Sequence, residues 1–260
     1  MTAYRTFTTE HGEFRIQARD RIFGRNAGVA ETMMARHFLS SPKSRVLVVG
    51  AHVGTVAIPL SLHCAEVVAI EANPETFMML EANIATNKHG NIVAFQVAAN
   101  DKNEEIEFVA SVVNTGRSKR MPVFHDDDFF NDQPTVTKVR AARLDEYVGP
   151  LGPFDMVFMD CEGSEYFAFL GMPEILADAK TLIVEFYRRH IERVAAITVE
   201  QFIEPLWAFP VMLSPAIKEL AIGEEVPKLL KEIQADDGLI FCKYAGRAKQ
   251  LMKLWHLHKH

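Results

Sequence analysis

Residues 45–87 read RVLVVGAHVGTVAIPLSLHCAEVVAIEANPETFMMLEANIATN, and the spacing of their apolar residues sets the fold class. The β-branched runs RVLVV and EVVAIE predict two buried strands, and helical patterns follow them near 55–62 and over 74–87. Asn73 and Pro74 mark the start of the second helix, because Asn caps free backbone N–H groups and Pro needs no donor at the first helical position. This βαβα order predicts an α/β protein with a parallel sheet. The expected buried stripe of the second helix is Phe77, Leu80 and Ile84.

Further strand patterns extend the sheet toward the C-terminus. FDMVFMD (154–160) and KTLIVEF (180–186) are nearly continuous apolar runs, which are typical of central parallel strands. NIVAFQVAAN (91–100), followed by the alternating EEIEFVASV (104–112), predicts a strand and then an edge strand or hairpin arm. GLIFCKY (238–244) is expected to close the sheet as an antiparallel last strand. The remaining predicted elements are a strand in TVTKVRAARL (135–144), a helix after Ser164, a helix over 198–207, a strand in FPVML (209–213) and a helix over 224–234.

The chain divides into one main domain with two extensions. No repeat or low-complexity linker interrupts residues 45–245, which we expect to form a single domain. Residues 1–44, with a helical pattern over 27–39, predict an N-terminal helical cap. Residues 111–135 carry a basic and an acidic run without an apolar period, and predict a long mobile loop. Residues 246–260 form a basic C-terminal tail.

Composition and charge exclude several classes of function. The 260 residues carry 28 Lys plus Arg against 34 Asp plus Glu, a net charge of -6, which argues against nucleic acid as the partner. The 3 cysteines are far apart in the sequence, as in proteins of a reducing cytoplasm. The first residues lack the apolar core of a signal peptide, and glycine, histidine and proline interrupt the longest apolar stretch, 46–62. We therefore expect a cytoplasmic protein without a membrane span.

A glycine turn and a strand-end carboxylate predict an adenosine-containing cofactor. Gly50 and Gly54 lie between the first strand and its helix, where glycine lets the backbone turn tightly and approach a ligand. Glu71 ends the second strand about 20 residues on, where doubly wound folds place a carboxylate for the ribose hydroxyls. A dinucleotide would require G-x-G-x-x-G, which this turn lacks. The sequence therefore favours S-adenosylmethionine over a nicotinamide cofactor.

A second group of acidic residues follows the next central strands. Asp160 ends FDMVFMD and Glu185 lies at the end of KTLIVEF, so both should face one crevice with Gly50 and Glu71. These carboxylates are suited to act as general bases for a hydroxyl, as oxygen ligands of a divalent cation, or as partners of the cofactor's ammonium group. The acidic residues at the start of the following helix could instead have a purely structural role. Glu162 and Glu165 precede or begin a helix, whose N-terminus favours negative charge, and for Glu165 we favour that role.

Six segments carry a resemblance to a known family. They are VVGAHVG, AIEANPETFMMLEANIATN, VAANDKNEEIEF, ARLDEY, FDMVFMDCEGSEYFAFLGM and LIVEF, in that order within residues 46–186. Together they resemble the FkbM-type branch of class I S-adenosylmethionine-dependent methyltransferases. The resemblance implies a doubly wound, Rossmann-like α/β fold whose seven-stranded sheet has an antiparallel last strand. It also implies O-methylation of a hydroxyl on a sugar or secondary metabolite. The family usually carries Asp where this chain has Val48, Asn where it has His52, and commonly Pro where it has Ala72.

The resemblance and the motifs together give a set of site residues. Asp160 is the first choice of general base, because it combines the family match with a place at the crevice. The predicted catalytic residues are Asp160, Glu162, Glu185 and His190. The predicted cofactor-binding residues are Gly50, Ala51, His52, Gly54, Glu71, Ala72, Asn100, Asp101 and Asp160. We assign no metal ligands; a divalent cation stays open but is not favoured.

Three alternatives accompany this interpretation. The first alternative, suggested by Val48, is a protein that kept the fold for binding or assembly and lost catalysis, because fold does not imply function. The acidic run at 125–128 and the C-terminal histidines His256, His258 and His260 are weaker metal hypotheses, since such runs are more often solvated. The tail, with Leu251, Leu254 and Trp255 on one helical side, is expected to pack on the domain, with a homodimer contact or an anionic surface as alternatives.

Overall fold

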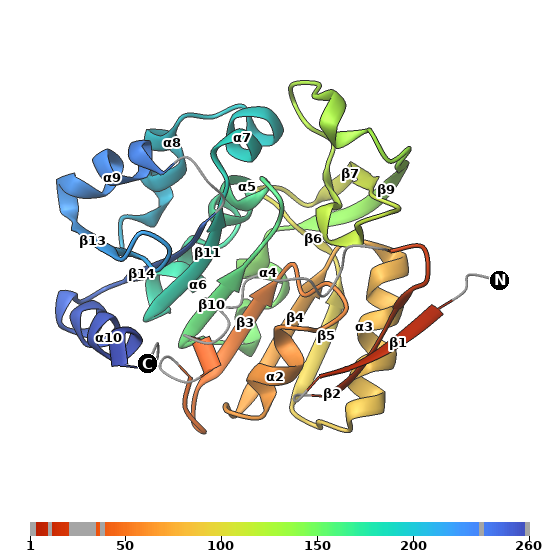
Figure 1. Cartoon of the computed structure of the whole chain (residues 1–260), viewed down its shortest axis with the longest axis horizontal. Helices are drawn as coiled ribbons and strands as arrows, with labels where there is room; N and C mark the ends of the chain where they lie inside the picture. The colour runs from red at the N-terminus through yellow and green to blue at the C-terminus, as the bar shows by residue number, and fades with distance from the viewer. Residues whose placement is uncertain (1–3, 10–11, 21–34, 37–39, 234–236, 258–260) are drawn as a thin grey trace.

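The computed structural model describes residues 4–9, 12–20, 35–36, 40–233 and 237–257 (Figure 1). The predicted helix over 27–39 falls outside these residues, apart from residues 35–36. Within the described ranges, no helix combines the length and the apolar character that crossing a bilayer requires.

The main sheet has eight strands, and its parallel half follows the predicted alternation. In spatial order the strands are β13 (Glu219–Ile222), β12 (Val211–Ser214), β14 (Asp237–Cys242), β11 (Thr181–Phe186), β10 (Met156–Met159), β3 (Arg45–Val49), β4 (Glu66–Glu71) and β5 (Ile92–Gln96). All neighbours from β11 to β5 are parallel. The expected antiparallel last strand is β14, which lies between β11 and β12.

The predicted count of seven strands is wrong by one edge strand. After β12 the chain reverses in a short turn, where Lys218 has a φ of 61° and the Ser214 hydroxyl accepts the Ile217 N–H at 3.4 Å. The returning segment pairs with β12 as β13. Nothing in the apolar pattern marks so short a hairpin arm, whose side chains are mostly exposed.

Helices cover both faces of the main sheet, as Figure 1 shows. Alternate residues of each strand face opposite layers: Leu47 and Val49 belong to one apolar cluster, Val46 and Val48 to the other. The first layer contains α4 (Leu144–Tyr147), α5 (Glu165–Leu170), α6 (Pro173–Asp178), α8 (Val199–Ile203) and α9 (Val226–Glu232). The second contains α2 (Ala57–Ser61), α3 (Pro74–Asn87) and α10 (Ala245–Leu257). The fold is therefore doubly wound.

The described part of the N-terminus contains a β-hairpin that the sequence did not indicate, while the helical cap stays a prediction. β1 (Tyr4–Thr9) and β2 (Gly12–Gln17) pair antiparallel, and they lie against α3. The Asn83 and Asn87 side chains of α3 accept the backbone N–H groups of Arg15 at 2.7 Å and Glu13 at 3.0 Å. This contact also shifts the buried face of α3 away from the predicted stripe. Leu80 is fully buried, but Phe77 and Ile84 are half-buried, and the other buried residues are Thr76, Met79 and Asn83.

A second sheet carries the predicted hairpin arm. Its order is β6 (Ala98–Ala99), β9 (Thr135–Ala142), β7 (Glu104–Ala110) and β8 (Lys119–Arg120). Residues 111–135, which we call the 111–135 segment, lie between β7 and β9. They contain β8 and two short 3-10 helices, η2 (Thr115–Arg117) and η3 (Asp127–Phe129). Regular structure in this segment is limited to these short elements, and its mobility stays a prediction.

The basic tail forms the long helix α10. Ala248 and Leu251 are buried in the same apolar cluster as Ile240 of β14. Packing on the domain, the favoured alternative for this tail, is what the structure shows for these two side chains.

Candidate functional site

The predicted site residues follow the carboxyl ends of four adjacent parallel strands. Gly50 follows β3, Glu71 ends β4, Asp160 follows β10 and Glu185 lies in β11. The chain runs from β3 outward to β4 and β5, then returns to place β10 on the other side of β3. Ligands of open α/β sheets bind at such a point of reversal, beyond the carboxyl ends of the strands. The structure therefore brings the two sides of the predicted crevice together.

The glycine turn is packed tightly against the end of β10. Gly50 has a φ of 80°, and a Cβ atom there would lie 1.7 Å from the Asp160 carbonyl oxygen. His52 has a φ of 51°, a conformation that Asn, Asp and His tolerate better than other side chains. That requirement agrees with the Asn usual at this position in the resembling family. The turn continues through Gly54, at a φ of 98°, into α2.

Glu71 has the chemistry expected of a ribose-binding residue. Its Oε2 accepts the His52 N–H at 2.9 Å, and its Oε1 accepts the Asn73 N–H at 2.7 Å. Burial raises the pKa of Glu71 to about 7, against the hydrogen bonds from Asn73 and His52, which lower it. Each carboxylate oxygen has two acceptor positions. The Ala72 N–H acts on this carboxylate as well, and the three backbone donors still leave acceptor capacity for a further donor.

A hydrogen-bonded chain links this turn to two distant residues that the sequence did not indicate. His52 Nε2 lies 2.8 Å from the Thr115 Oγ1. The hydroxyl and N–H of Thr115 donate to Asp20 Oδ2 at 2.5 and 2.9 Å. Because the Thr115 hydroxyl gives its proton to Asp20, His52 Nε2 is the donor to Thr115. Burial lowers the pKa of His52 to about 4, against the charge of Asp20, so the imidazole is neutral at pH 7.

The turn after β10 gathers carboxylates around Cys161. Burial raises the pKa of the Cys161 thiol well above its usual range, and the charges of Glu165, Asp160, Glu71 and Glu185 raise it further. Each of these four carboxylates therefore acts on the same buried thiol. Glu165 begins α5, is 1% exposed and accepts the Cys161 N–H at 2.7 Å. This bond holds the turn at the start of the helix. The favoured role, a negative charge at the helix N-terminus, stays a prediction, since burial raises the pKa of Glu165 to about 7.

The other predicted catalytic residues form a neighbouring group that includes an unforeseen lysine. Glu162 Oε2 lies 3.3 Å from His190 Nδ1 and 3.3 Å from the Nζ of Lys119. The Lys119 side chain is 2% exposed and comes from β8, within the basic run of the 111–135 segment. Burial lowers the pKa of His190 to about 2, and the positive charges of Lys119, Arg117 and Arg189 lower it further. The imidazole is therefore neutral.

Asn100 is held by its own neighbours. It is fully buried, its Oδ1 accepts from Arg120 at 3.0 Å, and its Nδ2 donates to Glu104 at 3.0 Å. The Arg120 guanidinium also lies 3.7 Å from the centre of the Phe167 ring. Cofactor contacts of Asn100, Asp101, Ala72 and Ala51 stay predictions.

The acidic run at 125–128 is used in an ion pair. Asp126 accepts from Arg189 at 2.6 and 2.8 Å, and the Arg189 hydrogen bond holds the pKa of Asp126 below its usual range. Asp128 lies 2.6 Å from the same guanidinium. His125 pairs with the fully exposed Asp127. The run thus anchors the 111–135 segment to Arg189, next to His190. Because Asp126 and Asp128 are paired with this guanidinium, the contact argues against a metal site at 125–128.

Known proteins place the chain in a family. A family model described as the methyltransferase FkbM domain matches residues 49–224. The methyltransferase FkbM of Methylobacillus flagellatus KT is 14% identical, with a TM-score of 0.47 over 77% of this chain and 44% of that chain. TYW2 of Pyrococcus horikoshii in complex with MeSAdo is 14% identical, with a TM-score of 0.51 over 94% of this chain and 73% of that chain. TYW2 of M. jannaschii in complex with AdoMet is 14% identical, with a TM-score of 0.48 over 93% of this chain and 86% of that chain.

These matches differ in what they establish. At 14% identity the P. horikoshii structure shows the fold alone. This chain spans less than half of the M. flagellatus protein. No curated protein matches the chain. The family model, in contrast, covers more than half of the chain, including the glycine turn, Glu71 and the turn after β10. The chain therefore belongs to the FkbM methyltransferase domain family.

Proposed function

We propose that this protein is an S-adenosylmethionine-dependent methyltransferase that methylates a hydroxyl group of a small molecule or glycan. The observation that carries the proposal is the family match over residues 49–224, which spans both sides of the crevice. S-adenosylmethionine supplies a methyl group already activated by its sulfonium. The protein's own task is then to orient the acceptor and exclude water.

The residues around Glu71 fit this cofactor. The carboxylate lies at the end of β4, is 7% exposed and retains acceptor capacity beside the glycine turn. It would hold the ribose hydroxyls, and the turn from Gly50 to Gly54 would line the nucleoside. The absence of a G-x-G-x-x-G sequence supports a cofactor without a pyrophosphate. Predicted contacts from Asn100 and Asp101 belong to the same proposal.

Asp160 is our choice for the base that takes the proton of the acceptor hydroxyl. It follows β10 directly and lies beside the glycine turn, and its charge acts on Cys161 together with those of Glu71 and Glu185. A carboxylate accepts a proton best when it is within hydrogen-bond reach of the attacking oxygen. Glu162, Glu185 and His190 lie at the same end of the sheet. Because Asp160 is also a predicted cofactor contact, the Asp160→Asn variant should lose methyl transfer by a larger factor than it loses cofactor affinity.

Calorimetric titration with S-adenosylmethionine and S-adenosylhomocysteine tests the cofactor assignment. We expect micromolar binding of both, no binding of NAD, and a loss of at least about 100-fold in the Glu71→Ala variant, since a buried acceptor of two hydroxyls would be removed. Glu81→Ala, which removes an exposed carboxylate from the middle of α3, is the matched control and should bind as the wild type does. Equal binding by Glu71→Ala would contradict the assignment.

A binding or assembly protein without catalysis is the second candidate. Val48, where the resembling family usually carries Asp, is 0% exposed and packs in an apolar cluster. If neither sulfur nucleoside binds at millimolar concentration, this candidate replaces the methyltransferase. We also propose a cytoplasmic location, supported by the free thiols of Cys64, Cys161 and Cys242.

A further inference from the structure

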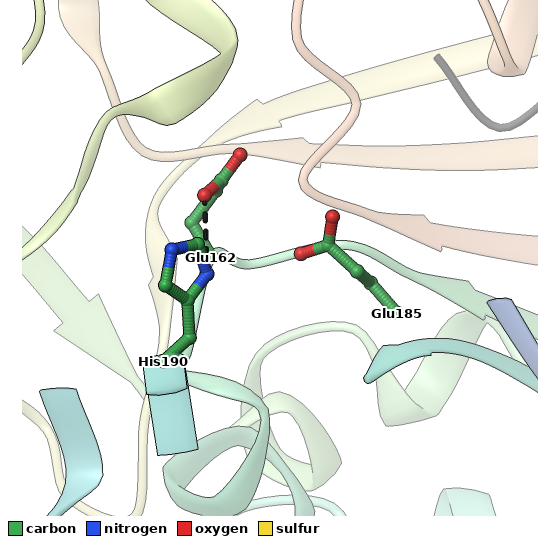
Figure 2. A group of neighbouring side chains, drawn as sticks. All are labelled: Glu162, Glu185 and His190. Carbon is green, nitrogen blue, oxygen red and sulfur yellow. Dashed lines mark ion pairs between the residues drawn. The ribbon is translucent and has the colours of Figure 1, made fainter. Parts of the chain in front are cut away.

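Three side chains from separate elements converge beside the proposed cofactor site. Glu162 comes from the turn after β10, Glu185 from β11 and His190 from α7 (Arg188–His190). One carboxylate oxygen of each glutamate and one ring nitrogen of the histidine all lie within 4.8 Å of one another. Figure 2 shows the Glu162 carboxylate and the imidazole facing each other, with the Glu185 carboxylate directed toward them from the side.

The imidazole of His190 is buried, and its ring nitrogens make no hydrogen bond to any residue that the structure describes. Its side chain is 6% exposed. Nδ1 lies 3.3 Å from Glu162 Oε2, without the geometry of a hydrogen bond. Buried polar groups without partners are rare and costly, so each one requires an explanation. A ligand that accepts the nitrogen lone pair would provide one.

The two carboxylates of the group supply the negative charge that a cation site requires. Lys119 offsets part of it, with its Nζ 3.3 Å from Glu162 Oε2, and the positive charges of Arg117 and Arg189 also act on His190. Glu162 is 14% exposed and Lys119 is 2% exposed, so the group is largely shielded from water. An imidazole binds metals through the lone pair of a ring nitrogen.

We propose that Glu162, Glu185 and His190 form a binding site for a divalent cation. Two carboxylates and one imidazole suit a first-row ion such as Mn²⁺ better than Ca²⁺ or Mg²⁺, which prefer oxygen ligands throughout. Ligand atoms bonded at about 2.0–2.2 Å lie up to about 4.4 Å apart across the ion. The three ligand atoms lie within 4.8 Å of one another, so the side chains would need to move only slightly closer together to bind the ion.

A cation here would serve the acceptor side of the crevice. Glu162 follows Asp160 by two residues, and Glu185 lies in β11, the strand beside β10, so the ion would lie at the same end of the sheet as the proposed base. A bound divalent ion lowers the pKa of a coordinated hydroxyl. That use rests on the proposed methyl transfer, whereas the binding of the ion does not.

Titration of the chelator-treated full chain with Mn²⁺, followed by electron paramagnetic resonance, tests the site. A background with His256, His258 and His260 replaced by Gln removes the histidine-rich end of the sequence as a competing binder. In that background we expect one bound Mn²⁺ per chain, with affinity reduced at least about tenfold by Glu162→Gln, Glu185→Gln or His190→Asn. The matched controls are Glu105→Gln and His125→Asn, both exposed and outside the group, and they should bind as the parent does.

A readout on the parent protein keeps the test independent of how the variants fold. Pulsed measurements on bound Mn²⁺ should show coupling to a single imidazole nitrogen, and that coupling should vanish in His190→Asn. No binding by the parent up to about 1 mM Mn²⁺, or a bound ion without nitrogen coupling, would overturn the proposal. Calorimetry with S-adenosylhomocysteine on the same sample reports separately on the cofactor site, so failure of either proposal is distinguishable from failure of the other.

Discussion

Gly50 is the residue where the two halves of the site meet through backbone atoms alone. A Cβ atom there would have to occupy the space of the Asp160 carbonyl. The backbone φ of 80° is also one that residues other than glycine rarely adopt. We predict that Gly50→Ala lowers the free energy of unfolding by roughly 3 kcal/mol or more, because backbone strain and a steric overlap with main-chain atoms add together. Denaturant unfolding followed by circular dichroism measures the change.

Gly90 gives the matched control for this substitution. It precedes β5, and a Cβ atom added there meets nothing within 4 Å. Gly90→Ala should therefore change the free energy of unfolding by less than about 0.5 kcal/mol. Equal stability of the two variants would mean that the close approach at Gly50 does not exist in solution.

At the scale of elements, the 111–135 segment connects parts of the site that the main sheet leaves apart. Thr115 contacts His52 after β3, and Lys119 contacts Glu162 after β10. The N–H groups of Val123 and Phe124 donate to the carbonyls of Val194 and Arg193, which follow α7. Asp132 joins the two ends of the segment, because its carboxylate accepts hydrogen bonds from the Ser111 hydroxyl and from the N–H groups of Val112 and Val113. A segment held at so many points has a defined position over the carboxyl ends of β3 and β10.

We predict that Asp132→Ala loosens this segment without unfolding the domain. Three hydrogen bonds to one carboxylate would be lost, so trypsin should cut after Arg117, Lys119 or Arg120 several times faster than in the wild type. Limited proteolysis with mass spectrometry identifies the cut. Asp127→Ala, in the same segment but with a fully exposed side chain, should leave the rate unchanged. Equally slow cleavage of both variants would show that Asp132 does not hold the segment.

For the whole molecule, the buried carboxyl groups of the site predict how stability depends on pH. Burial raises the pKa of both Glu71 and Glu165 to about 7 in the folded chain, from a usual value near 4.5. The folded state therefore binds protons that the unfolded state releases. Their contribution to stability is fully present below about pH 4.5 and is lost as the pH rises through 7, at up to about 1.4 kcal/mol per pH unit for each group.

Comparison with a Glu71→Gln, Glu165→Gln variant isolates this effect. His52 and His190 have lowered pKa values and act in the opposite direction below pH 6.5, in the wild type and the variant alike. The difference in unfolding free energy, wild type minus variant, should therefore fall between pH 5 and pH 8. A difference that is constant or that grows over this range would show that these carboxyls are ionised normally in the folded protein.

The sequence allowed good predictions where the signal was local. Asn73 caps α3 through its side chain, Glu71 ends β4, and Asp160 follows β10, because each position follows from strand periodicity and a helix start. Contacts between distant segments gave no such signal. Thr115 and Asp20 are 95 residues apart, and Lys119 and Glu162 are 43 apart. Lys119 belongs to a basic run without an apolar period, yet it is buried beside a carboxylate, which no pattern of neighbouring residues predicts.

The N-terminus and the sheet edge show the same limit for whole elements. The alternating residues of β1 and β2 gain stability from the amide side chains of α3, more than 60 residues away. The strand β13 is short and mostly exposed, so its pairing with β12 depends on a turn and not on an apolar run. Tertiary context decides both cases.

A crystal structure of the full chain grown with S-adenosylhomocysteine shows whether Glu71 binds the ribose of the cofactor. We predict the nucleoside beyond the carboxyl ends of β3 and β4, with both ribose hydroxyls about 2.5–3.0 Å from the Glu71 carboxylate oxygens. A nucleoside bound elsewhere, or a site that stays empty at saturating concentration while Glu71 keeps only its bonds to backbone N–H groups, would contradict this prediction.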